Sequence, residues 1–172
     1  SSRPVVATHS CCRALADHPR NLTDDMIRSI AEKNGVVQVN FYPLFLDSGF
    51  GAVLDGSGIA ERGGAVENEF IADPADPKKR EAWHIVKEEL KSLPRPSYRR
   101  IVDHIDHIVD LVGIDYVGLG SDFDGIAVTP EGLEDVSGFS LVLDEMRERG
   151  YTESDIEKVA SGNFFRVMKA CQ

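Results

Sequence analysis

The stretch GIDYVGLGSDFDG, from Gly113 to Gly125, decides the fold class. Its middle, Tyr116 to Gly120, is a short run of apolar and small residues of the kind that buried parallel strands contain. Two similar runs precede it along the chain, Val5 to Thr8 and Val36 to Phe41. Each run passes into polar residues, and helical patterns separate the runs. We therefore expect an α/β fold, with a parallel sheet covered by helices.

The helices are marked by capping residues and by the spacing of apolar side chains. Thr23 is a good N-cap, acidic residues follow it in the first turn, and Gly35 marks the end of this first helix. The strongest pattern runs from Tyr98 to Val112, where apolar residues recur three and four positions apart. Three further helices are expected near the C-terminus, at Leu141 to Glu148, Thr152 to Ala160 and Asn163 to Ala170.

The segment from Asp47 to Pro96 differs from the rest of the chain. It is Gly-rich and polar as far as Gly64, and a helical pattern then runs from Pro77 to Leu90. Long structured segments that follow the carboxyl end of a strand usually cover a ligand site. We therefore predict one domain over residues 1–172, with an insertion at 47–96 that forms a lid or wall.

Composition excludes several classes of protein. The 172 residues are 42% hydrophobic, which is enough for a core, and the formal net charge is −10. An acidic chain without a basic stripe is a poor partner for nucleic acid or anionic membranes. No run of about 18 apolar residues predicts a membrane span. Three cysteines do not form a disulfide framework, so we expect a reducing compartment and a cytoplasmic location.

Two side chains with catalytic potential follow predicted strands. The carboxyl ends of parallel strands form the ligand-binding face of α/β folds, and His9 and Asp122 lie at two such ends. An imidazole suits zinc, and a carboxylate can bind metal or move a proton. Arg20 adds a planar cation whose forked donors match a carboxylate.

Each of these residues also has a structural interpretation. His9 could end its strand as an ordinary hydrogen-bonding residue. Asp122 could stabilise a turn with Asp124 and Gly125, because Asp and Gly favour turns. Arg20 could be a solvated loop cation. Tyr42 and Phe45, just beyond the middle strand, could line a pocket or simply pack.

His104 and His107 are a weaker candidate for a metal site. They are three positions apart and share a helix face, but both belong to a strong amphipathic pattern, which favours a structural role. His18 and His84 have no companion at a ligand spacing and are interpreted as surface or packing residues. The sequence also lacks a nucleophile elbow and a dinucleotide-binding glycine pattern.

Four segments closely resemble the C-terminal part of the renal (membrane) dipeptidase family. They are THSCCRALADHPRNLTDDMI at 8–27, GVVQVNF at 35–41, HIDHIVDLVGIDYVGLGSDFDG at 104–125 and PEGLEDVS at 130–137. Their order and spacing extend the resemblance over nearly the whole chain, which makes it far more specific than any single segment.

The resemblance implies a (β/α)8 barrel metallohydrolase with two zinc ions that cleaves dipeptides and tolerates D-residues at the C-terminal side. His9 would be a zinc ligand, Arg20 would hold the substrate's carboxylate, and Asp122 would transfer protons at the scissile bond. A whole barrel needs about 250 residues. We therefore expect about three βα units here, with the remaining zinc ligands in an N-terminal half, on the same or a separate chain.

The expected partners are a small peptide and that N-terminal half. The open sheet edges of an isolated half would favour association, including a homo-oligomer, and the isolated chain should be inactive. Two alternatives stay open. One is another two-metal hydrolase acting on N-acyl amino acids or lactones, and the other is a non-catalytic fragment that retains idle site residues.

Overall fold

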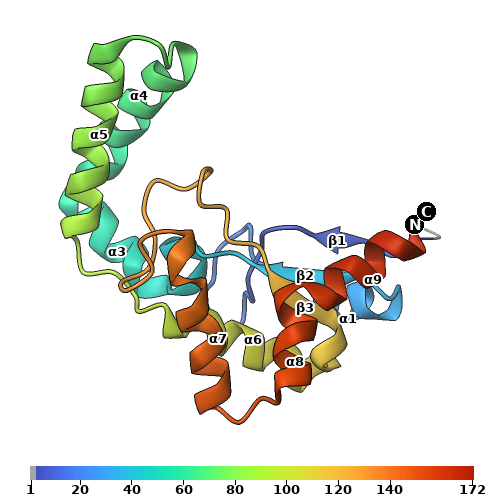
Figure 1. The fold of residues 1–172 in the computed structure, drawn as a ribbon. Helices are drawn as coiled ribbons and strands as arrows, with labels where there is room; N and C mark the ends of the chain where they lie inside the picture. Colours follow the sequence, from blue (N-terminus) through green and yellow to red (C-terminus); the bar gives the residue numbers. More distant parts are fainter. Residues whose placement is uncertain (1–2) are drawn as a thin grey trace.

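The structure, a computed structural model, describes residues 3–172, and its centre is a parallel three-stranded sheet (Figure 1). The strands are β1 (Val6–Ala7), β2 (Val36–Val39) and β3 (Val117–Leu119), in the order β1-β2-β3. The strands are shorter than the apolar runs, so His9 follows β1 by two residues. The α/β prediction is confirmed, whereas the closed barrel stays a prediction, because the sheet within residues 3–172 is open.

Five helices pack with the sheet. The helices α1 (Asp24–Glu32), α6 (Arg99–Val112) and α9 (Asn163–Ala170) contact its strands, α7 (Phe139–Glu148) packs on α6, and α8 (Glu153–Glu157) follows α7. The start of α1 follows the predicted cap, since the Thr23 hydroxyl accepts a hydrogen bond from the Met26 amide. The helix predicted to end at Ala160 does not end there. A π-helical turn, Lys158–Gly162, joins α8 to α9.

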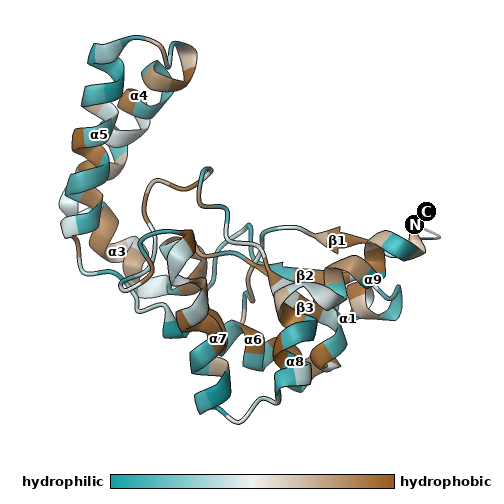
Figure 2. Cartoon of the chain, viewed as in Figure 1, coloured by the Kyte–Doolittle hydropathy of each residue, from teal (hydrophilic) through white to brown (hydrophobic). Residues whose placement is uncertain are grey.

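The main core lies between the sheet and α6. Ile101, Ile105 and Ile108 form the apolar stripe of this helix and are fully buried, as are Val37 and Val117 in the strands. Burying each isoleucine stabilises the fold by roughly 1.5–3 kcal/mol. Figure 2 shows hydrophobic and hydrophilic residues alternating along these helices, as expected for helices with one buried face.

A helical arm projects from the body (Figure 1); it begins just before the insertion predicted at 47–96. It consists of α2 (Pro43–Leu46), α3 (Ser48–Ser57), α4 (Ile59–Ala72) and α5 (Pro77–Ser92). The helix predicted from Pro77 is confirmed, and the Gly-rich stretch, for which no helix was predicted, is also helical. A second core offsets the cost of about 1 kcal/mol per helical glycine; it contains Phe50, Ile59, Trp83, Val86, Leu90 and Val128.

None of the helices described over residues 3–172 combines the length and apolar character that crossing a membrane requires.

Candidate functional site

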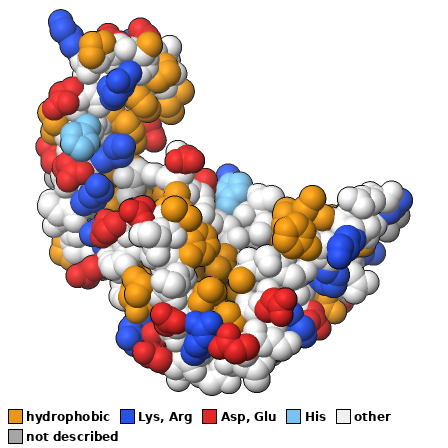
Figure 3. Space-filling model, in the orientation of Figure 1, with side chains coloured by type: hydrophobic (Ala, Val, Ile, Leu, Met, Phe, Trp, Pro, Cys, Tyr) orange, Lys and Arg blue, Asp and Glu red, His pale blue; other side chains and the backbone are white. Residues whose placement is uncertain are grey.

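One cavity brings together the three residues singled out in the sequence. His9, Arg20 and Asp122 all line a cavity of about 430 Å³ at the carboxyl edge of the sheet. His9 follows β1, Asp122 follows β3, and Arg20 lies in the loop between β1 and α1. Figure 3 shows the molecular surface hollowed between the projecting arm and the body. The topology therefore creates the cluster, because parallel strands end at the same edge.

The hydrogen bonds of His9 define its tautomer. Arg20 Nη2 lies 3.0 Å from His9 Nε2, and Thr8 Oγ1 lies 2.7 Å from Nδ1. A guanidinium can only donate, so Nε2 must accept with its lone pair. The proton is then on Nδ1, which donates to the Thr8 hydroxyl. This is the form in which an imidazole binds a metal through Nε2.

The backbone on either side of Arg20 is held by local hydrogen bonds. The Ser10 hydroxyl donates to the Arg20 carbonyl oxygen at 2.7 Å, and the Arg20 amide donates to His18 Nδ1 at 3.2 Å. The ring of His18 also packs on Phe45, with ring centroids 4.6 Å apart. Burial and the charge of Arg20 lower the pKa of His18. His18 is therefore a packing residue, in agreement with its interpretation from sequence.

Asn21 ties the same loop to the start of the arm. Its side chain is buried, and its Oδ1 accepts from the Cys11 amide at 3.2 Å. Its Nδ2 donates to the carbonyl oxygens of Ala16 at 2.8 Å and Phe45 at 2.9 Å. Every hydrogen-bonding atom of this buried amide has a partner, which stabilises one conformation of the loop beside Arg20.

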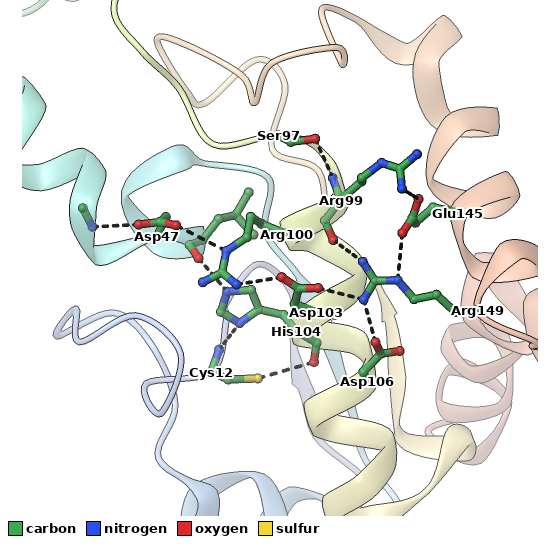
Figure 4. A network of polar contacts seen from close by, with 12 residues as sticks. Cys12, Asp47, Ser97, Arg99, Arg100, Asp103, His104, Asp106, Glu145 and Arg149 are labelled. Carbon is green, nitrogen blue, oxygen red and sulfur yellow. Dashed lines mark hydrogen bonds and ion pairs between the residues drawn. The ribbon is translucent and has the colours of Figure 1, made fainter.

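His104 provides a second tether from the core of α6. Its Nδ1 accepts from the Cys12 amide at 3.1 Å, and its Nε2 lies 3.1 Å from the Leu46 carbonyl oxygen, to which it donates. Figure 4 shows the ring beside Cys12 and Arg100. Burial lowers the pKa of His104 to about 4, so the ring is neutral at physiological pH. Its structural interpretation is correct.

A network of ion pairs surrounds this tether (Figure 4). Arg100 pairs with Asp47 at 3.3 Å and with Asp103 at 2.7 Å, which joins the start of the arm to α6. Arg149 joins α6 to α7 through Asp103 and the buried Glu145, at 2.7 and 2.8 Å. Burial raises the pKa of Asp103, but hydrogen bonds from Arg149 and Arg100 outweigh it, and the net shift is downward.

Asp122 is held by a residue that sequence reasoning missed. Its backbone has φ = 61°, a left-handed conformation that Asp tolerates better than most residues. Its Oδ2 accepts from Asn40 Nδ2 at 3.1 Å, and Asn40 is fully buried directly after β2. A polar residue directly after a buried strand was the available signal, the same signal that singled out His9.

Residues in the arm and directly before it also line the cavity. Tyr42 and Phe45 line the cavity, and Glu67 of α4 lines it with them. Burial, together with the Glu67 charge, raises the pKa of Tyr42. Nothing in the sequence marked Glu67, because its place at the cavity depends on how the arm folds back. Glu67 belongs to the segment for which a lid or wall was predicted, and that role stays a prediction.

The alternative ligands do not form a metal site. His107 lies 2.8 Å from Asp24 on α1 and does not share a partner with His104. Cys11 and Cys12 are buried free thiols, and burial raises the pKa of Cys12 to about 12. Across residues 3–172, no group of three or more His, Cys, Asp or Glu side chains could hold a metal. Among the described residues that line the cavity, His9 is the one histidine.

All 172 residues of this chain match a family model. That model describes the membrane dipeptidases, peptidase family M19, and it matches residues 1–172. The chain belongs to this family. The resemblance found in the four segments is therefore confirmed, and the family is one of metallopeptidases that includes dipeptidases.

Individual relatives agree with this assignment. The chain is 28% identical to dipeptidase verJ of Clonostachys rogersoniana over 172 residues, which are 100% of this chain and 33% of verJ. It is 31% identical to dipeptidase aclJ of Aspergillus oryzae, a match covering 96% of this chain and 29% of aclJ. The chain thus spans about a third of the length of these membrane dipeptidase relatives.

Two solved structures have the same arrangement of elements. A metallo peptidase from Rhodobacter sphaeroides, liganded with a phosphinate mimic of the dipeptide L-Ala-D-Ala, matches with a TM-score of 0.70 at 28% identity. The probable dipeptidase PvdM from Pseudomonas aeruginosa matches with a TM-score of 0.74 at 30% identity. Each match covers 100% of this chain, but 37% and 46% of those chains.

Proposed function

We propose that this chain is part of a zinc-dependent dipeptidase that hydrolyses the peptide bond of dipeptides, including those with a D-residue at the C-terminal side. The observation that carries the proposal is the single cavity lined by His9, Arg20 and Asp122. Membership of the membrane dipeptidase family supports it, and so does the dipeptide mimic bound to the Rhodobacter relative.

His9 fits one position of a metal site. Its Nε2, which accepts from Arg20 in this structure, is the nitrogen that would bind the metal, and the Thr8 hydroxyl fixes the ring orientation from the other nitrogen. The further ligands of the proposed zinc ions would come from outside this chain, in an N-terminal half of the barrel. When bound, zinc would lower the pKa of a water and supply a hydroxide nucleophile near neutral pH.

Arg20 and Asp122 would act on the substrate. The Arg20 guanidinium, now donating to His9, would pair with the carboxylate of the dipeptide and fix its register, which favours short peptides over protein chains. Asp122 would accept the proton of the nucleophile and deliver it to the leaving amine. Asn40 would orient the Asp122 carboxylate through the hydrogen bond to Oδ2.

The test measures turnover of a panel of substrates by the complete protein, before and after its metal is removed. We expect turnover of L-L and L-D dipeptides, loss of turnover with a chelator and recovery with zinc, whereas this chain alone should be inactive. Turnover of N-acyl amino acids or lactones without any turnover of dipeptides would refute the proposal.

The Arg20→Lys variant tests the role of the guanidinium. It should raise KM for dipeptides about tenfold or more, because an ammonium cannot make the paired hydrogen bonds of a guanidinium. Arg28→Lys is the matched control, since Arg28 is an exposed residue of α1 that pairs with Asp25. An equal KM for both variants would show that Arg20 does not bind the substrate.

A further inference from the structure

Glu67 brings a carboxylate from the arm to the proposed active-site cavity. It lies on α4, is half-buried and lines the cavity of about 430 Å³ together with Arg20 and Asp122. It also lines an adjoining cavity of about 240 Å³ that extends toward Trp83 in the core of the arm. Tyr42 lines both cavities, and its raised pKa reflects burial and the nearby Glu67 charge.

No cation of the arm pairs with this half-buried carboxylate. On the adjacent helix α5, Glu89 pairs with Arg62, and Glu88 pairs with Lys91 at 2.8 Å. Within residues 3–172, Glu67 makes no hydrogen bond or ion pair. The positions three and four residues away on its own helix are Gly63, Gly64, Phe70 and Ile71, so no intrahelical partner is available.

The charges around the cavity are arranged to suit a zwitterion. Arg20 supplies the positive charge on the wall formed by the loop before α1, and Glu67 supplies a negative charge from the arm. At neutral pH a free dipeptide carries a carboxylate at one end and an ammonium at the other. A carboxylate without a partner in a partly enclosed cavity gains most from a ligand that brings a cation to it.

We propose that Glu67 is a specificity-determining residue that binds a positively charged group of the substrate. This inference rests on the proposed function, because it assumes that the cavity binds the peptide whose carboxylate Arg20 holds. The group is an ammonium, and it has two possible sources: the free α-ammonium of the dipeptide, or the side chain of a lysine residue within it.

Calorimetric titration of the complete protein, including the N-terminal half proposed above, tests this inference. The ligands are alanyl-alanine, alanyl-lysine, lysyl-alanine and N-acetyl-alanyl-alanine, which lacks the α-ammonium. Glu67→Gln removes the charge and preserves the shape of the side chain. The control is Glu69→Gln, since Glu69 is an exposed residue of the same helix. We expect Glu67→Gln to raise Kd for cationic ligands roughly fivefold to tenfold, as for a partly exposed charged hydrogen bond.

The pattern across the ligands identifies the source. If Glu67 binds the α-ammonium, Glu67→Gln weakens all three free dipeptides and leaves the N-acetylated one unchanged. If it binds a basic side chain, only the lysine-containing dipeptides weaken. Either pattern supports the inference.

Three results would overturn it: a Kd within twofold of wild type for every ligand, an equal change in Glu69→Gln, or no binding of any free dipeptide to wild type. Turnover is measured on the same samples. If the dipeptides bind but are not hydrolysed, the proposed function fails, while the role of Glu67 is still decided by the Kd values.

Discussion

At the scale of single residues, Asn21 and His104 hold the loop that carries Arg20. Both side chains are buried, and both reach backbone groups of the short helix α2, at Phe45 and Leu46. Because Phe45 of α2 and Tyr42 directly before it line the cavity, these bonds connect two of the cavity's walls. A change at either residue should therefore affect stability and the geometry around Arg20 together.

His104 should make stability depend on pH. Its pKa is about 4 in the folded chain, against an ordinary value of 6.5. Below pH about 6.5 the unfolded chain binds a proton that the folded chain rejects, so the free energy of unfolding falls as pH drops from about 6.5 to about 4. The loss should total about 3 kcal/mol. Urea unfolding across this range measures it.

The control for this prediction is His104→Gln, which can still donate to the Leu46 carbonyl oxygen but does not titrate. Subtracting its pH profile from that of wild type isolates the His104 contribution. The variant should lose about 1–3 kcal/mol at neutral pH, because the Cys12 amide loses its acceptor. Parallel pH profiles for wild type and variant would show that His104 does not titrate as stated.

Asn21→Ala should destabilise the fold by about 2–4 kcal/mol. It leaves the Cys11 amide and the carbonyl oxygens of Ala16 and Phe45 without their partner, and buried polar groups without partners are costly. The measurement is chemical denaturation, with Asn68→Ala on the exposed surface of α4 as the control. A loss no larger than that of the control would contradict the role assigned to Asn21.

At the scale of elements, Gly120 permits the close approach of two strand ends. A Cβ at this position would lie 2.2 Å from the Thr8 carbonyl oxygen and 3.0 Å from that of Gln38. Backbone atoms cannot move aside as a flexible side chain can. The lack of a side chain at Gly120 therefore allows the end of β3, which leads to Asp122, to lie beside the segment that leads to His9.

Gly120→Ala should destabilise the chain by more than about 2 kcal/mol, since overpacking against backbone forces the strand ends apart. Thermal unfolding measures the change. Gly64→Ala is the matched control, because nothing lies within 4 Å of a Cβ there, and replacing a helical glycine should stabilise α4 by about 0.5–1 kcal/mol. Equal melting temperatures for the two variants would refute the steric argument.

At the scale of the whole molecule, the sheet has two open edges. β1 and β3 are the outer strands, and within residues 3–172 neither outer edge is paired with another strand. Unpaired backbone groups at a sheet edge are templates for association. The relatives that match this chain are longer, since it spans 46% of PvdM and 33% of verJ.

We therefore expect the chain by itself to self-associate at micromolar concentrations. Sedimentation velocity should give a sedimentation coefficient that rises with concentration. Adding the N-terminal half proposed above should replace these assemblies with one complex of equal stoichiometry. A monomer of 18.9 kDa at every concentration would show that the edges are protected.

Sequence alone determined the elements with strong local signals. The amphipathic pattern of α6, the Thr23 cap and the apolar strands each depend on a short stretch of chain, and the structure has all of them. The Gly-rich start of the arm was not predicted as helix, because the packing of Phe50 and Ile59 that offsets the glycines lies outside any local window. Strand lengths were overestimated for the same reason.

Sequence alone was enough to recognise the family and to single out His9, Arg20 and Asp122. Motif spacing and the ends of apolar runs can both be read directly from the order of residues. Only the tertiary structure placed Asn40 against Asp122, Asn21 against Phe45 and Glu67 on the cavity wall. The physical reason is that a hydrogen bond or a shared cavity depends on distance in space. Residues 24 to 82 positions apart meet only after the sheet edge and the arm have formed.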